Sequence, residues 1–265
     1  MKRSDTTDAL FNALRESAKP GPVNAIEKLI RCGSDRELCR INVLAFAAQH
    51  KLNEDDAIAA FLHAARFGIF DMSWNILCPA CGGVLDSGAT LKTVKQAEYR
   101  CVLCALGHEP TLDEIVEVTF TISPRVRRIA AHNPETLPWN EYYRQVFWSS
   151  VVDLPDDEAF AKWIKETTLG TFELSPGEKV VLSLQLSEGF VDVFDPVVNM
   201  TQDFEVKGEP AAESQSFSFV MTRDHASAST VQMRPGPLQL TLENRSNVRT
   251  LPAIWVISDK IHDFV

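Results

Sequence analysis

Six cysteines are spread unevenly along the 265-residue sequence, and four of them form two CxxC pairs. The first pair is Cys78 and Cys81, and the second, after a spacer of 19 residues, is Cys101 and Cys104. A CxxC turn directs two sulfur atoms toward one point, and two such turns complete a tetrahedron around a metal ion. The spacing therefore predicts a zinc ribbon with these four residues as ligands.

The chemistry of such a zinc ion follows from its ligands. Four thiolates leave no coordination position open for water or substrate, and they give the site a net charge of about −2, which makes a poor Lewis acid. We therefore expect a structural Zn²⁺ that stabilises the fold. A dithiol–disulfide switch formed by the same CxxC pairs is the alternative that the spacing leaves open.

Motifs that would indicate catalysis are missing from the sequence. It contains no GxGxxG, no GxxxxGK[ST], no GxSxG and no HExxH. The six histidines are scattered, and His225 has Asp224 and Ser227 beside it only because they are neighbours in the chain. No catalytic residue is predicted, and we expect a protein that is not an enzyme.

One compact basic cluster contains Arg125, Arg127 and Arg128. A solvated loop that pairs with acidic surface explains such a cluster in most proteins, and contact with an anion or a partner is the alternative. The other two cysteines, Cys32 and Cys39, are isolated thiols in a helical region, where we expect small buried apolar side chains.

Composition and charge limit the class of protein. Hydrophobic residues make up 45% of the chain and charged residues 23%, which is typical of globular proteins. No apolar run approaches the roughly 18 residues of a membrane span, and the N-terminus lacks the apolar core of a secretory signal. These features predict a cytoplasmic protein without a membrane span. The net charge is −10, and residues 150–265 alone carry −9, which argues against binding of a phosphate backbone there.

The N-terminal part of the sequence shows helical periodicity. We expect a flexible arm over residues 1–20 and a winged-helix-like unit over 21–77. The helices and the strand of this unit are expected at 22–33, 37–52, 53–68 and 69–78.

A winged helix often binds DNA, but the helix expected at 53–68 is acidic at its start. Asn53 is a good N-cap, and Glu54, Asp55 and Asp56 fill the first turn. A recognition helix usually offers Arg, Lys, Asn or Gln to base edges. Binding of nucleic acid is therefore not expected, and a role in packing or protein contact is favoured.

The remainder of the chain changes from mixed to strand-like periodicity. The zinc ribbon occupies residues 78–112, and a connection over 113–169 holds a strand at 116–123, an aromatic helix at 139–150 and an amphipathic helix at 156–168. From residue 170 to 265, alternating segments separated by turn residues predict an antiparallel β-sandwich. The expected fold class is α+β, with a helical unit, a zinc ribbon and a β-sandwich in that order.

Two stretches of the sequence resemble a known region of bacterial proteins. They are "FLHAARFGIFDMSWNILCPACGGVLDSGATLKTV" and "CVLCALGHEPTLDEIVEVTFTISPRVRRI", and the similarity continues through "PGEKVVLSLQL" and "LQLTLENRSNVRTLPAIWV". The region that they resemble is uncharacterised and lies N-terminal to class III adenylate/guanylate cyclase catalytic domains. It has no known ligand-binding residues that could be assigned here.

The resemblance implies a regulatory or sensory module whose partner is a cyclase catalytic domain, in cis or in trans. No cyclase catalytic domain is present among these 265 residues. Because class III cyclases act as dimers, the resemblance also favours a homodimer. A nucleic-acid-binding regulator built from a winged helix and a zinc ribbon is the alternative function.

Overall fold

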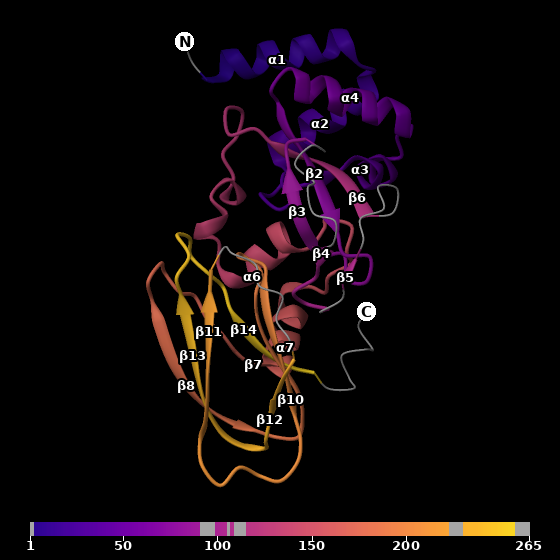
Figure 1. Cartoon of the computed structure of the whole chain (residues 1–265). Helices are drawn as coiled ribbons and strands as arrows, with labels where there is room; N and C mark the ends of the chain where they lie inside the picture. Colours follow the sequence, from indigo (N-terminus) through magenta and orange to yellow (C-terminus); the bar gives the residue numbers. More distant parts are fainter. Residues whose placement is uncertain (1–2, 91–98, 105–106, 109–114, 223–229, 258–265) are drawn as a thin grey trace. The chain divides into compact units, whose positions relative to one another are not determined.

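A computed structural model describes residues 3–90, 99–104, 107–108, 115–222 and 230–257 (Figure 1). Within these residues the chain folds into two compact units. Residues up to Asp153 supply nearly all of the first unit, and residues from Leu154 onward supply nearly all of the second. Helices and several β-sheets are both present, so the predicted α+β class is confirmed. Among the described residues, every helix is too short or too polar to cross a lipid bilayer.

The first unit begins with helices whose apolar faces share one buried cluster. They are α1 (Arg3–Ser17), α2 (Pro20–Cys32), α3 (Val43–His50) and α4 (Glu54–Arg66). The start of α4 agrees with the sequence prediction, since the side chain of Asn53 accepts a hydrogen bond from the backbone N–H of Asp56.

The segment predicted as a flexible arm is a packed helix over residues 3–17. Phe11 and Leu14 lie one helical turn apart on α1, and both are buried in the cluster of the first unit. Arg15, near the end of α1, forms an ion pair with Glu27 of α2. The burial of an apolar i, i+3 pair explains why the segment is ordered against its neighbours.

The helix predicted over residues 37–52 begins only at Val43. Arg40 has a φ angle of +49°, which a right-handed helix does not allow, and a short strand follows it, β1 (Ile41–Asn42). The Asn42 side chain then accepts hydrogen bonds from Leu44 N and Ala45 N, both 3.0 Å long, which fixes the helix start.

A four-stranded antiparallel sheet supports the helices of the first unit. Its strands, in order across the sheet, are β1, β6 (Val116–Ile122), β2 (Phe70–Leu77) and β3 (Val84–Gly88). The strands predicted at 116–123 and 69–78 are thereby confirmed. Phe120 and Ile122 point into the helical cluster. Because side chains alternate along a strand, Glu117 and Thr119 lie on the opposite face.

An aromatic segment completes the first unit. Short 3₁₀ turns, η2 (Ala130–His132) and η3 (Pro134–Thr136), lead to α6 (Trp139–Tyr142), which continues as a π-helical turn, η4 (Tyr143–Phe147). The sequence predicts one helix here with an aromatic face in the core. Its rings are buried as expected, but the helix changes its hydrogen-bond pattern after four residues and ends at Phe147.

Two very short strands flank the second CxxC pair, and they form a two-stranded sheet of their own. They are β4 (Tyr99–Arg100) and β5 (Gly107–His108). Residues 91–98, 105–106 and 109–112 of the predicted zinc ribbon lie outside the described residues.

The second unit starts with α7 (Asp157–Thr167), which confirms the helix predicted at 156–168. The side chain of Asp156 accepts a hydrogen bond from Ala159 N at 2.9 Å and so caps the helix. Trp163 on α7 meets Trp255 edge to face, with 5.1 Å between ring centroids. This contact packs α7 against one sheet of the second unit.

Two sheets of the second unit share one buried cluster. One sheet has the order β12-β10-β9-β14-β7 and the other has the order β11-β13-β8. The strands are β7 (Thr168–Thr171), β8 (Lys179–Leu186), β9 (Gly189–Asp195), β10 (Met200–Val206), β11 (Gln215–Met221), β12 (Val231–Met233), β13 (Gly236–Asn244) and β14 (Ala253–Ile257).

The pairing of these strands differs from the sequence prediction at two places. β10 with β12 and β11 with β13 are parallel pairs, whereas the sequence predicts antiparallel pairing throughout. The alternation of apolar residues indicates which side chains are buried, but it does not determine strand direction. The segment "TFELS" predicts a strand at 171–175, but the observed strand lies earlier, because β7 follows directly on α7 and ends at Thr171.

A buried carboxylate fixes two connections in the second unit. Asp195, at the end of β9, is fully buried and accepts hydrogen bonds from Val197 N and Val198 N at 3.0 and 2.9 Å. It also accepts one from Leu251 N. Burial raises the pKa of Asp195 to about 6, although the three backbone donors act in the opposite direction.

Candidate metal centre

The first CxxC pair lies in the turn between β2 and β3. Cys78 N donates to Gly83 O at 2.7 Å, and Gly82 N donates to Cys78 O at 2.8 Å. Gly82 has a φ angle of +68°, in the left-handed region that favours glycine. The turn therefore closes tightly after Cys81 and directs both sulfur atoms of the pair to one side.

Residues 147–152 hold this turn from the outside. Ser149 N donates to Gly82 O at 3.0 Å, and Trp148 forms an isolated antiparallel bridge with Gly83. A Cβ atom at Gly82 would lie only 2.4 Å from Cγ2 of Val152. The first CxxC turn is thus packed so closely against Val152 that residue 82 has no room for a side chain.

A buried polar network connects this support to the sheet. Glu117 on β6 is 7% exposed, and its Oε1 accepts hydrogen bonds from Ser149 Oγ at 2.8 Å and from Asn42 Nδ2 at 3.1 Å. Asn75 Nδ2 on β2 donates to the other oxygen of Glu117 at 3.4 Å. Each donor satisfies part of the buried carboxylate. Ser149 therefore links the sheet directly to the CxxC turn.

The four predicted ligands lie together. The sulfur atoms of Cys78, Cys81, Cys101 and Cys104 are all within 4.8 Å of one another, and none of the four is in a disulfide. Zn–S bonds of about 2.3 Å in a tetrahedron place sulfurs about 3.8 Å apart, which lies within this limit, so the cluster fits a bound ion. Cys78 and Cys101 are buried, which would shield the ion from water on that side.

The donor set of this site limits what it can do. Four thiolates suit zinc or an iron–sulfur centre better than magnesium or calcium, which prefer oxygen ligands. With all four cysteines bound to one ion, tetrahedral coordination is complete. The arrangement can therefore hold a metal and order the chain around it, but it offers no position for a substrate.

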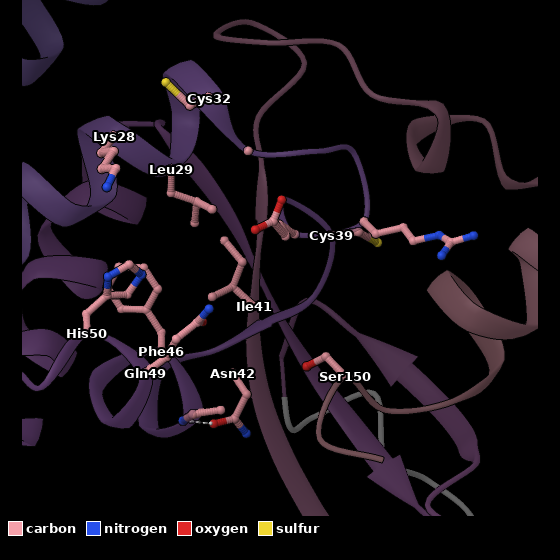
Figure 2. A pocket seen from close by; sticks show the side chains of 14 residues that line it. Lys28, Leu29, Cys32, Cys39, Ile41, Asn42, Phe46, Gln49, His50 and Ser150 are labelled. Carbon is pink, nitrogen blue, oxygen red and sulfur yellow. Dashed lines mark hydrogen bonds between the residues drawn. The ribbon is translucent and has the colours of Figure 1, made fainter. Parts of the chain in front are cut away.

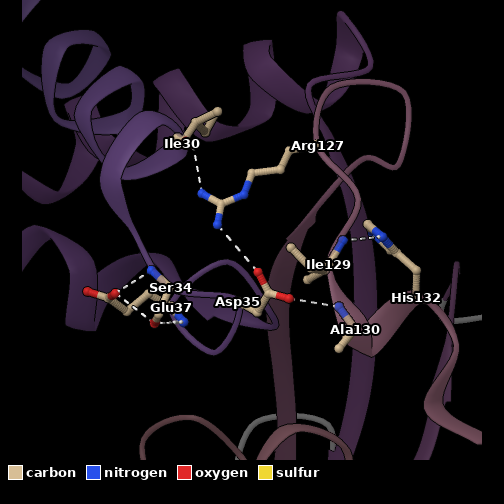
Figure 3. Close-up of polar contacts among 8 residues, drawn as sticks. All are labelled: Ile30, Ser34, Asp35, Glu37, Arg127, Ile129, Ala130 and His132. Atoms are coloured by element: carbon tan, nitrogen blue, oxygen red, sulfur yellow. Dashed lines mark hydrogen bonds and ion pairs between the residues drawn. The ribbon is translucent and has the colours of Figure 1, made fainter. Parts of the chain in front are cut away.

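The predicted arginine cluster is divided between two environments, and Figure 3 shows that of Arg127. Arg127 donates to Ile30 O at 3.0 Å and to an oxygen of Asp35 at 3.3 Å. The other Asp35 oxygen accepts from Ala130 N at 2.9 Å. Arg125 and Arg128 are exposed and make no hydrogen bond or ion pair with the described residues. A contact of the cluster with an anion or a partner therefore stays a prediction for Arg125 and Arg128.

A pocket of about 500 Å³ in the first unit is a further candidate binding site among the described residues (Figure 2). Its lining includes the apolar side chains of Leu29, Ile41 and Phe46. Lys28 and Gln49 also line it, and neither makes a hydrogen bond or an ion pair with the described residues. The volume lies in the range of small-molecule sites.

The pocket differs from a typical enzyme site because several of its polar side chains are already paired with other parts of the chain. Cys39, one of its lining residues, is buried and donates from Sγ to Gln145 O at 3.3 Å. Burial raises the pKa of the Cys39 thiol, so the thiol is kept in its unreactive neutral form. Arg36 is paired with Glu141, and Ser150 Oγ donates to Arg40 O at 2.7 Å. These polar groups are paired with other residues of the chain and so stabilise the fold.

Sequence reasoning missed the support of the CxxC turn and the pocket. Ser149 lies within the aromatic run at 139–150 and Val152 lies just after it. That run indicates a core helix and gives no sign of contact with a metal site. The expected isolated thiols are divided, since Cys39 is buried and Cys32 is exposed. The exposure of Cys32 contradicts the prediction that both would be buried.

Comparison with known proteins identifies a family. A family model described as "Family of unknown function (DUF5939)" matches residues 4–265, which is almost the whole chain. A search of curated proteins found none that matches, and a search of solved structures found none either.

Proposed function

We propose that this chain, which belongs to the family of unknown function DUF5939, is a non-enzymatic regulatory module with a structural zinc ion. The observation that carries the proposal is the closed set of four cysteine sulfurs within 4.8 Å of one another. A zinc ion with four protein thiolates is saturated, so it supplies folding energy and no catalysis. Structural zinc sites of this type contribute about 10–16 kcal/mol of apparent binding energy.

The partner that we propose is a class III nucleotide cyclase domain, joined to this chain or acting on it as a separate protein. Support comes from the resemblance of residues 61–94 and 101–129 to the region that precedes such domains. The location that fits a zinc–thiolate centre is the cytoplasm, where reducing conditions keep cysteines available to metals.

The finer architecture that we propose has three parts. The order α2, α3, α4, β2 supports a winged-helix-like unit over residues 21–77, and the CxxC turn between β2 and β3 supports a zinc ribbon. Two sheets that share one buried cluster support a β-sandwich in the second unit.

Nucleic-acid binding is the less favoured function. Glu54, Asp55 and Asp56 fill the first turn of α4, the helix that a DNA-binding winged helix would place against the duplex. Titration of the protein with a fluorescent DNA duplex at two salt concentrations tests this. Affinity that falls steeply with added salt would favour the nucleic-acid function over the cyclase function.

The metal is tested by elemental analysis and by cobalt substitution. We expect one zinc ion per chain, and a cobalt form whose absorption indicates four thiolates and no exchangeable ligand. Cys101→Ser should lose the metal and lower the melting temperature, whereas the control Cys32→Ser, an exposed thiol outside the cluster, should change neither. A metal-free protein with an unchanged melting temperature would contradict the structural role.

The regulatory role is tested by nucleotide turnover. A class III cyclase domain from the same genome is assayed with ATP and with GTP, alone, mixed with residues 1–265, and fused behind them. Regulation predicts a change in rate of about fivefold or more, which is the usual lower range of allosteric coupling. Equal rates in all three forms would refute the cyclase association and leave the zinc site unaffected.

A further inference from the structure

The outer face of α4 is an exposed apolar stripe. Ile58 is 38% exposed and Leu62 is 49% exposed, and Ala59 beside them is exposed as well. The opposite side of the helix is buried in the cluster of the first unit through Ala57, Ala60, Phe61 and Ala64. Residues 58, 59 and 62 share one face at the helical period. A helix that is apolar on both sides has a second surface to cover.

Opposite charges stand at the two ends of this stripe. Asp55 lies one turn before Ile58, and Arg66 lies one turn after Leu62, so both project on the same face. Both side chains are exposed, and neither makes a hydrogen bond or an ion pair with the described residues. The stripe is therefore acidic at its start, apolar in the middle and basic at its end.

Such a pattern is complementary to itself when it is turned through 180°. The midpoint between Asp55 and Arg66 falls between residues 60 and 61, and the midpoint between Ile58 and Leu62 falls at residue 60. An antiparallel pair of α4 helices about a two-fold axis at this point places Asp55 opposite the second copy's Arg66, twice. It also places each Leu62 over the second copy's Ala59 and Ile58, where the small alanine lets the helices approach.

We propose that the exposed stripe of α4 is the contact between two copies of this chain. The inference stands on the exposure, spacing and charges of Asp55, Ile58, Ala59, Leu62 and Arg66, and it does not depend on the regulatory function. A two-fold interface must present the same patch on both subunits, and this stripe satisfies that condition. A parallel arrangement would instead face Asp55 with Asp55 and Arg66 with Arg66, which costs energy.

The size of the stripe limits the strength of the dimer. One helix pair buries less than the roughly 1,200 Å² at the low end of stable interfaces. We therefore expect a dimer that dissociates on dilution through the micromolar range. Sedimentation velocity of the full chain across concentration measures this equilibrium.

Charge exchange tests the antiparallel geometry directly. Asp55→Lys alone and Arg66→Glu alone each place like charges at both ends of the contact, so each should weaken the dimer at least about tenfold. The double variant should restore dimerisation, since the introduced lysine of one copy then faces the introduced glutamate of the other. An equimolar mixture of the two single variants should also associate, because each end of the mixed dimer again pairs opposite charges.

Matched controls separate the contact from effects on the helix. Glu158→Lys and Lys165→Glu make the same charge changes in the first and last turns of α7, and neither should alter dimerisation. Leu62→Glu should abolish it, whereas Val181→Glu, at a residue on β8 that is 50% exposed, should not.

Three results would overturn the proposal. The first is a chain that stays monomeric up to about 1 mM, because a dimer with a micromolar dissociation constant would be fully formed at that concentration. The second is a dimer that the single charge variants leave intact. The third is a mixture of the two single variants that fails to associate.

Discussion

Replacing Gly82 by alanine should destabilise the first CxxC turn by two separate effects. Gly82 has a φ angle of +68°, and a left-handed conformation costs an alanine about 1–2 kcal/mol. The new Cβ would also lie 2.4 Å from Cγ2 of Val152, and relief of such an overlap costs about 1–3 kcal/mol. We expect the free energy of unfolding to fall by about 2–5 kcal/mol in total.

Two further variants separate these effects. Gly68→Ala has the same backbone cost, because Gly68 has a φ angle of +77°, but nothing lies within 4 Å of its new Cβ. It should lose only about 1–2 kcal/mol. Val152→Ala in the Gly82→Ala background removes the overlapping methyl group and should recover most of the additional loss.

Urea unfolding of the zinc-loaded protein measures these differences, and competition with a chromophoric chelator measures zinc affinity in parallel. Gly82→Ala should weaken zinc binding, since it displaces the turn that carries Cys78 and Cys81, whereas Gly68→Ala should not. Equal losses for Gly82→Ala and Gly68→Ala would refute the argument that residues 147–152 fix this turn. Failure of Val152→Ala to recover stability would refute it as well.

Three other predictions follow from single contacts. Arg127→Ala should lower the free energy of unfolding by about 1–2 kcal/mol, because it leaves Ile30 O and one oxygen of Asp35 without their donor, and Arg125→Ala should be nearly neutral in the same urea titration. The folded pKa of Asp195 is raised from 3.8 to about 6, so the native state holds the proton of Asp195 more tightly than the unfolded state does. The free energy of unfolding, relative to that of Asp195→Asn, should therefore fall by up to about 3 kcal/mol as pH rises from 4 to 7. Mass spectrometry after brief iodoacetamide treatment should find Cys32 alkylated and Cys39 unmodified; alkylation of Cys39 at the same rate would contradict its burial and raised pKa.

Local patterns predicted a large part of the fold. The bounds of β8 coincide with the segment "KVVLSLQL", whose side chains alternate in exposure as on a strand with one covered face. The start of α4 coincides with its cap, because the Asn53 side chain satisfies a backbone N–H that the helix leaves free. The cysteine spacing predicted the cluster of four sulfurs for a similar reason, since the chemistry of a CxxC turn is local.

Other features depend on contacts between distant residues. Asn42 ends the extended segment before α3 and also donates to Glu117, and nothing in residues 37–52 indicates that second contact. A buried glutamate on β6 is stable only because Ser149 and Asn75 reach it from other parts of the chain. The parallel pairing of β10 with β12 likewise depends on how the intervening chain returns to the sheet.

The two halves of the metal centre differ in how much the protein itself organises them. Cys78 and Cys81 lie in the turn of a hairpin whose strands extend over eight and five residues, and Ser149 and Val152 hold that turn from outside. The strands that flank the second pair, β4 and β5, have two residues each, and a two-stranded sheet so short is not stable alone. The first CxxC pair is already held in place by its hairpin. The binding energy of a metal would therefore mainly order the second CxxC pair. The structural metal that we propose would therefore add order to the second CxxC pair, although both units have hydrophobic cores of their own.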